Sequence, residues 1–131
     1  MAFQKNKSIE DALKVLMEIA GEEDSCGSRE LSRRLGMDPT RVNRFLKTLH
    51  AAGFLEQDWN QRYHPGAGME VLSAQCLHGS RLLRASLPVF ADLIPADFTI
   101  ATGVLHRDQV SYLFHASDRK STRLNSSHRI R

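Results

Sequence analysis

Two amphipathic segments joined by a four-residue turn, Gly36–Pro39, constrain the fold of this chain more than any other feature. A short segment begins near Ser28 and stops at Gly36, and a longer one runs from Asp38 to about Ala52. Asp38 followed by Pro39 is typical of a helix start, because the carboxylate accepts hydrogen bonds from free backbone N–H groups and proline fits the first turn. The spacing of the two segments predicts a helix-turn-helix.

The longer segment has two chemically different faces. With about 100° of rotation per residue, the apolar side chains share one stripe, which is formed by Val42, Phe45, Leu46 and Leu49. The other side carries cationic or neutral hydrogen-bonding side chains and no carboxylate, namely Thr40, Asn43, Arg44 and Lys47. Such side chains can bind guanine, adenine and phosphates, so the pattern predicts a recognition helix in the major groove of duplex DNA. For this helix taken alone, an ordinary solvated basic face is the alternative.

Basic side chains on both sides of this helix support the prediction. Arg29, Arg33 and Arg34 lie on the preceding segment, where a supporting helix crosses the phosphate backbone. Two short β-type runs around residues 54–55 and 63–64 predict a hairpin wing, with Arg62 able to contact phosphate. We interpret Trp59, in the turn of this wing, as a packing residue rather than as a stacking contact with base or sugar. The predicted DNA-binding residues are Arg29, Arg33, Thr40, Arg41, Asn43, Arg44, Lys47 and Arg62.

The distribution of charge matters more than the net charge of +3. Residues 118–131 carry five basic side chains and one acid, whereas the rest of the chain carries 13 basic and 14 acidic residues. Residues 25–65 contain seven basic and four acidic residues. Positive charge is therefore concentrated where the helix-turn-helix and the wing are predicted, as expected of a nucleic-acid-binding segment.

Further helix and strand patterns lie on either side of this region. The stretch from Ser8 to Gly21 predicts an amphipathic helix with Ser8 as its N-cap. The stretch 69–86 predicts a linker helix, and Pro88 would either break it or start another short helix. Alternating stretches at 98–105 and 110–116 predict two strands joined by a turn.

The composition changes abruptly after Ser117. Residues 118–128 resemble the translation of a common sequencing adapter, so we interpret residues 118–131 as a non-native tail. A natural basic tail of a DNA-binding protein is the alternative. On our interpretation we expect the natural protein to continue past Ser117. We also expect the two predicted strands before it to present unpaired apolar edges.

No residue pattern points to catalysis, a cofactor or a metal. Cys26 and Cys76 lie 50 residues apart without a CxxC or zinc-finger spacing, and we interpret both as reduced cysteines. The serines lack a GxSxG elbow, and residues 66–68 lack the third glycine of a dinucleotide-binding loop. Neither a signal peptide nor an apolar run of spanning length is present. We therefore expect a cytoplasmic protein that is no enzyme, binds no cofactor or metal and does not enter a membrane.

Several parts of the sequence resemble the IclR family of bacterial transcription regulators. They are Ser8–Leu16, Arg29–Leu49, Ala52–Leu55 with Tyr63, and Val104–Leu113, of which the last resembles the first hairpin of the family's effector-binding domain. The resemblance implies a homodimer or higher homo-oligomer that binds double-stranded DNA at a palindromic operator. It also implies a small-molecule effector, but only in the full-length protein, and it assigns no ligand-binding residue here.

Together these patterns predict a mainly α fold with a small β-wing. We expect a winged helix-turn-helix DNA-binding domain at residues 1–66 and a linker helix region at 67–94. An incomplete α/β effector domain, represented by one β-hairpin, would occupy 95–117, before the tail at 118–131. The predicted function is sequence-specific DNA binding in transcription regulation. A winged-helix module that binds protein instead of DNA is the alternative.

Overall fold

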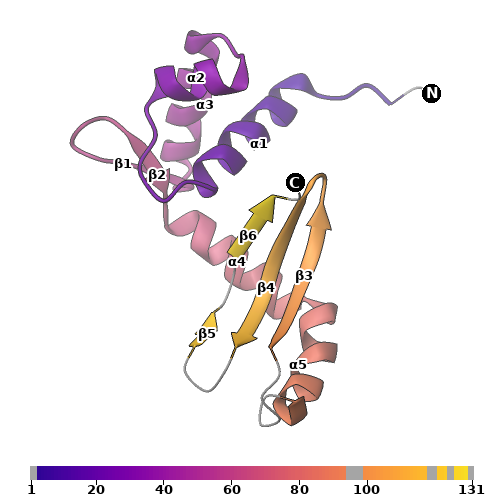
Figure 1. The fold of residues 1–131 in the computed structure, drawn as a ribbon. Coiled ribbons are helices and arrows are strands. Elements are labelled where there is room, and N and C mark those ends of the chain that lie inside the picture. The colour runs from indigo at the N-terminus through magenta and orange to yellow at the C-terminus, as the bar shows by residue number, and fades with distance from the viewer. Residues whose placement is uncertain (1–2, 94–98, 118–120, 124–125, 130–131) are drawn as a thin grey trace. The chain divides into compact units, whose positions relative to one another are not determined.

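The computed structural model of the chain describes residues 3–93, 99–117, 121–123 and 126–129. The helices are α1 (Lys7–Ala20), α2 (Ser28–Leu35), α3 (Pro39–Ala51), α4 (Ala67–Gly79) and α5 (Arg81–Leu93). The strands are β1 (Leu55–Gln57), β2 (Tyr63–Pro65), β3 (Ile100–His106), β4 (Gln109–Ser117), β5 (Ser121–Arg123) and β6 (Ser126–Arg129). The chain divides into two compact units, one up to Ser73 and one from Ala74 onward. The predicted mainly α fold with a β-wing is confirmed (Figure 1).

Helix α1 supplies one wall of the first unit's core. Its N-cap is Asn6, whose side chain accepts hydrogen bonds from the backbone N–H groups of Ser8 and Ile9, so the prediction of Ser8 as N-cap is wrong. The helix begins at Lys7 because Asn6 already satisfies these donors. Val15 and Ile19 are fully buried on its inner face.

Helices α2 and α3 form the predicted helix-turn-helix. Helix α2 begins at Ser28, where the sequence predicts its start, and follows Gly27 without a side-chain cap. Gly36 ends α2 in the left-handed conformation, with φ of 62°, which glycine adopts without steric cost. Asp38 caps α3 as predicted, since its carboxylate accepts a hydrogen bond from the backbone N–H of Arg41.

The first unit's core joins the three helices to the β1–β2 hairpin. Its buried side chains are Val15, Ile19, Cys26, Leu31, Val42, Leu46, Leu55 and Tyr63. Backbone hydrogen bonds of 2.8 Å in both directions between Cys26 and Tyr63 join the loop before α2 to β2. The wing is therefore attached both to the end of α3 and to the start of α2.

Two glycines bring the start of α4 against the turn between α3 and β1. The backbone N–H of Gly66 donates to the carbonyl of Phe54, and that of Gly68 donates to the carbonyl of Gly53, both at 2.9 Å. A Cβ atom on Gly68 would stand 2.7 Å from the carbonyl oxygen of Gly53. Residues 67 and 68 are therefore part of the first turn of α4, which begins at Ala67.

The prediction of one uninterrupted helix over residues 69–86 is wrong, because this stretch is divided between two helices that meet at Ser80. The hydroxyl of Ser80 accepts a hydrogen bond from the backbone N–H of Leu83 at 3.3 Å, as an N-cap does. Pro88 neither breaks nor starts a helix but lies inside α5. No residue of α4 is buried. The predicted end of the linker region, at residue 94, lies outside the described residues.

The second unit contains the predicted hairpin. Strands β3 and β4 pair antiparallel from Ile100 with Ala116 to His106 with Gln109, and the predicted start at Phe98 lies outside the described residues. Strands β5 and β6 both pair with β4, so the expectation of an unpaired edge on β4 is wrong. A small core holds Leu83, Phe114 and Ala116, and the rings of Phe90 and Phe114 stack with centroids 5.3 Å apart.

No helix in the described ranges is both long enough and apolar enough to span a membrane.

Candidate nucleic-acid interface

Helix α3 exposes a face of neutral and cationic side chains. Its apolar stripe is turned inward, with Val42 and Leu46 fully buried and Phe45 and Leu49 partly buried. Four predicted residues lie exposed on the outward side, and we call them the recognition face: Thr40, Asn43, Arg44 and Lys47. The division of α3 into a buried and an exposed face is therefore as predicted.

Two arginines of α2 add exposed positive charge. Arg29 and Arg33 are exposed and lie one turn apart on α2. Among the described residues, no ion pair joins Arg29, Arg33, Arg44 or Lys47 to a carboxylate. These four charges are therefore available to an anionic partner.

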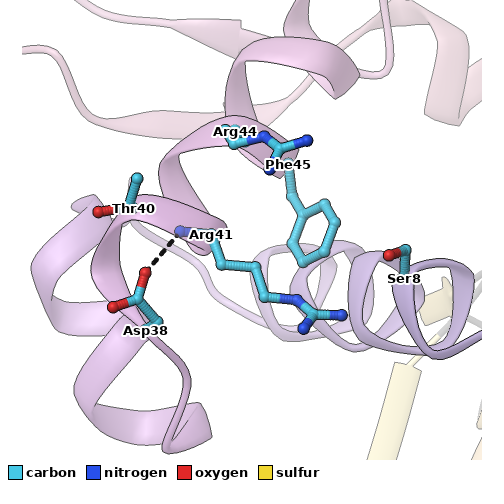
Figure 2. A pocket seen from close by; sticks show the side chains of 6 residues that line it. All are labelled: Ser8, Asp38, Thr40, Arg41, Arg44 and Phe45. Atoms are coloured by element: carbon cyan, nitrogen blue, oxygen red, sulfur yellow. Dashed lines mark hydrogen bonds between the residues drawn. The ribbon is translucent and has the colours of Figure 1, made fainter.

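Arg41, unlike the residues of the recognition face, is bonded to a carboxylate of another helix. Its guanidinium bonds the carboxylate of Asp11 on α1, with Nη2 and Oδ2 3.0 Å apart, and lies 5.5 Å from the centroid of the Phe45 ring. Figure 2 shows Arg41 extending below Phe45 toward Ser8, in a hollow that Arg44 also lines. The structure thus brings Arg41 to α1, and Arg41 ties α3 to that helix.

Asp11 is a residue that the sequence analysis missed. Its side chain is only 6% exposed and also bonds the ammonium groups of Lys7 and Lys14, at 3.1 and 3.9 Å. The hydrogen bond and the charge of Asp11 raise the pKa of Lys7. A signal was present, because Asp11 precedes Val15 and Ile19 at steps of four residues and so lies on the buried face of α1.

Arg34, which was predicted to lie where α2 crosses a phosphate backbone, is paired with carboxylates of its own unit. Its guanidinium bonds the carboxylates of Glu22 and Glu30 and lies 3.6 Å from that of Glu18. It therefore joins α1, the loop after α1 and α2, and its charge is balanced within the unit.

Arg62 is held at the base of the wing rather than at its tip. Its Nε donates to the carbonyl oxygen of Ser25 at 3.0 Å, and its Nη2 donates to Ser25 and lies 3.1 Å from a carboxylate oxygen of Glu30. The carboxylate of Asp58 in turn accepts from the Ser25 hydroxyl and from the backbone N–H of Arg62, both at 2.9 Å. We call Ser25, Glu30, Asp58 and Arg62 the wing anchor. Arg62 is therefore bonded within the unit, and its predicted contact with phosphate stays a prediction.

The electrostatics of the wing anchor favour its charged form. The backbone hydrogen bond from Arg62, followed by the Ser25 hydroxyl, holds the pKa of Asp58 below its usual value, against desolvation that raises it. For Glu30 desolvation raises the pKa, but Arg34 and Arg62 together outweigh it and the pKa is lowered. Both carboxylates therefore stay ionised and bonded well below neutral pH.

Trp59 stands at the tip of the wing and is 90% exposed. The interpretation of Trp59 as a packing residue is therefore wrong. Its neighbours Asn60 and Gln61 are also exposed, so residues 59–61 present an aromatic ring and two amides without a charge.

The comparisons with known proteins agree with this geometry. Residues 8–58 match the IclR helix-turn-helix domain. It is 28% identical over 123 residues to the HTH-type transcriptional regulator KdgR of Dickeya chrysanthemi, and equally so to that of Escherichia coli K12. These alignments cover 91% of this chain but only 40% and 47% of the two regulators.

A solved structure supports the IclR-type fold beyond the helix-turn-helix. An IclR family transcriptional regulator from Brucella abortus aligns with a TM-score of 0.83 and 22% identity, over 96% of this chain and 50% of that one. At this identity the likeness concerns the fold alone. The chain therefore spans about half, or less, of the length of the proteins it resembles.

In the described part of the chain, no group of three His, Cys, Asp or Glu side chains could hold a metal ion. Both cysteines are free thiols, Cys26 buried and Cys76 exposed. Burial is the main cause that raises the pKa of Cys26, so its thiol stays protonated near neutral pH.

Proposed function

We propose that the chain binds duplex DNA as the reading domain of an IclR-type transcription regulator, with α3 in the major groove. The observation that carries the proposal is the recognition face, which is exposed and contains no carboxylate between Thr40 and Lys47. Arg44 and Asn43 are suited to read guanine and adenine edges, and Thr40 and Lys47 to bind phosphate or base edges. The names of the related regulators support the same role.

Phosphate contacts are assigned to Arg29 and Arg33 of α2 and to Lys47 of α3. All three are exposed and without an ion pair in the described ranges, so binding a phosphate breaks no existing bond. Arg41 and Arg62 would first have to leave Asp11 and Glu30. We therefore propose that these two arginines position the elements that bind DNA.

Association of two copies is proposed to occur on α1. Ile9, Leu13 and Met17 follow one another at steps of four residues and are 59%, 53% and 45% exposed, so they form an apolar stripe on the outer face of α1. A second copy of the chain would cover this stripe and present two recognition helices to a palindromic site. Sedimentation equilibrium should show a dimer that Leu13→Glu converts to a monomer. A wild-type monomer at all concentrations would rule this interface out.

Small-molecule control is proposed only for a regulator of the relatives' full length. A thermal-shift screen of small metabolites against this chain should therefore give no change in Tm. A saturable shift would instead place an effector site within the present chain.

A salt titration tests the proposed function. Fluorescence anisotropy of a labelled duplex should give a log affinity that falls linearly with log salt, by about 0.9 for each phosphate neutralised. Lys47→Ala should reduce the slope by about that amount, whereas Lys5→Ala, in the extended segment before α1, should not. No binding at low salt, or a slope near zero, would contradict the proposed function.

A further inference from the structure

The tip of the wing is built around an exposed aromatic ring. Trp59 is the only tryptophan of the chain and has the highest exposed fraction among the large hydrophobic residues of the described part. Tryptophan is usually well buried, and an isolated indole in water has no stabilising contact within the fold. Ile9, Leu13 and Met17, also exposed, share one helix face, whereas Trp59 is alone on a loop. Its position therefore has no explanation in the packing of the described unit.

The backbone that carries Trp59 is held in one conformation. The N–H of Asp58 donates to the carbonyl of Arg62, and the N–H of Gln61 donates to the carbonyl of Asp58, both at 2.9 Å. Gln61 adopts a φ of 59°, so the chain reverses tightly between the two strands. The wing anchor then fixes both ends of this turn to Ser25 and Glu30. Trp59 is thus presented from a pre-ordered loop, which lowers the entropy lost on binding.

The wing lies directly beside the proposed recognition helix. Strand β1 follows α3 after a turn in which the N–H of Phe54 donates to the carbonyl of Leu49 at 2.9 Å. In Figure 1 the β1–β2 loop projects outward from the three helices beside α3. The chemistry of residues 59–61 suits DNA, because a neutral tip is not repelled by phosphates. An indole can stack on a sugar or base, and two amides can donate to groove acceptors.

We propose that Trp59 is the residue through which the wing contacts duplex DNA, packing its indole on the sugar–base edge of the groove next to the one occupied by α3. The proposal rests on the proposed function, since it needs α3 to dock on the same duplex. The wing then contacts DNA through an apolar side chain, whereas Arg62 holds the wing in place.

The fluorescence of the single tryptophan tests this contact directly. An unlabelled 30-base-pair duplex of mixed sequence is titrated into the full chain at low salt, while the emission of Trp59 is recorded. In parallel, anisotropy of the same duplex carrying a label measures binding independently. The emission should shift or be quenched with the midpoint given by anisotropy.

Variants supply a second readout that separates an apolar contact from a charged one. Trp59→Ala should lower affinity about tenfold, the scale of one aromatic contact with a nucleotide, and Trp59→Phe should restore part of it. The salt slope should stay unchanged, because no charge is removed. Leu105→Ala, which removes another exposed apolar side chain, from strand β3 of the second unit, is the matched control and should bind as the wild type does. Circular dichroism melts verify that each variant folds.

The outcomes distinguish the inference from the proposed function. If anisotropy reports binding while the emission of Trp59 is unchanged, or if Trp59→Ala binds as tightly as Leu105→Ala, the wing contact is overturned and the role of α3 stands. If anisotropy detects no binding at low salt, the proposed function itself fails.

Discussion

The arginines of the first unit divide into two groups by what lies within reach of each guanidinium. Arg33 and Arg44 are exposed without a carboxylate partner in the described ranges, whereas Arg41 and Arg62 bond Asp11 and Glu30. A paired arginine has to exchange one anion for another when it meets phosphate, so its net gain is small. Position on the surface alone therefore does not identify a DNA contact.

Replacing Arg62 should affect stability more than DNA contact. Arg62→Ala removes the bonds to Ser25 and Glu30, and since the side chain is 41% exposed we expect a loss of about 1 kcal/mol of unfolding free energy. DNA affinity should fall modestly, because the wing loses its anchor, while the slope against salt stays the same. Urea unfolding and the salt titration measure the two effects.

Arg33→Ala is the matched control for Arg62→Ala. It removes the same charge from an exposed site, so stability should change by less than about 0.5 kcal/mol and the salt slope should flatten by about 0.9. A flattened slope for Arg62→Ala, equal to that of Arg33→Ala, would show that Arg62 binds phosphate after all.

The exposure of residues on the helices was easier to predict than the identity of the residues that they bond. Helical periodicity separates Val42 and Leu46 from Arg44 and Lys47 correctly, because rotation per residue is a local property. Which carboxylate meets a given arginine depends on distances across the fold. Arg62 meets Glu30 because the Cys26–Tyr63 bridge places β2 beside the loop before α2. No local sequence pattern predicts this bridge.

Helices were predicted well where the sequence has residues that favour a helix start at one end and a helix stop at the other. Helix α3 matches its expected range because Asp38 and Pro39 favour its start and Gly53, with φ of 78°, follows its end. The break between α4 and α5 was missed, although Gly79 followed by Ser80 combines a helix-ending residue with an N-cap residue. Pro88 was expected either to break a helix or to start another one, but it lies inside α5, where water can bind the carbonyl that the proline leaves without a partner.

The packing of α4 against the preceding turn depends on the absence of a side chain at residue 68. Gly68→Ala places a Cβ 2.7 Å from a carbonyl oxygen and 3.0 Å from the carbonyl carbon of Gly53, both backbone atoms. We expect a loss of about 1–3 kcal/mol, as for other overpacked sites. Thermal melts followed by circular dichroism measure it.

Gly79→Ala provides the comparison for that substitution. It is also in α4, but a Cβ there would meet no atom within 4 Å, so Tm should change little. Equal effects of the two substitutions would mean that helix propensity, and not the contact with Gly53, decides the result at residue 68.

At the scale of the whole molecule, the first unit was predicted more completely than the second. The helix-turn-helix has local signals at almost every boundary, and residues 8–58 match a known domain. The pairing of β5 and β6 with β4 was not predicted, because residues 118–131 were set aside as a tail. A strand edge offers backbone N–H and C=O groups with which many sequences can pair, so amino-acid composition does not predict which segment pairs with it.

The central claim is that α3 reads base edges through its exposed face, and Arg44 lies in the middle of that face. Selection of binding sites from a random duplex library, carried out with the wild type and with Arg44→Ala, tests it most directly. We predict that the substitution costs about 1–3 kcal/mol on the selected site and relaxes the preference at one base position. Equal losses on selected and random duplexes, with an unchanged sequence preference, would contradict the claim.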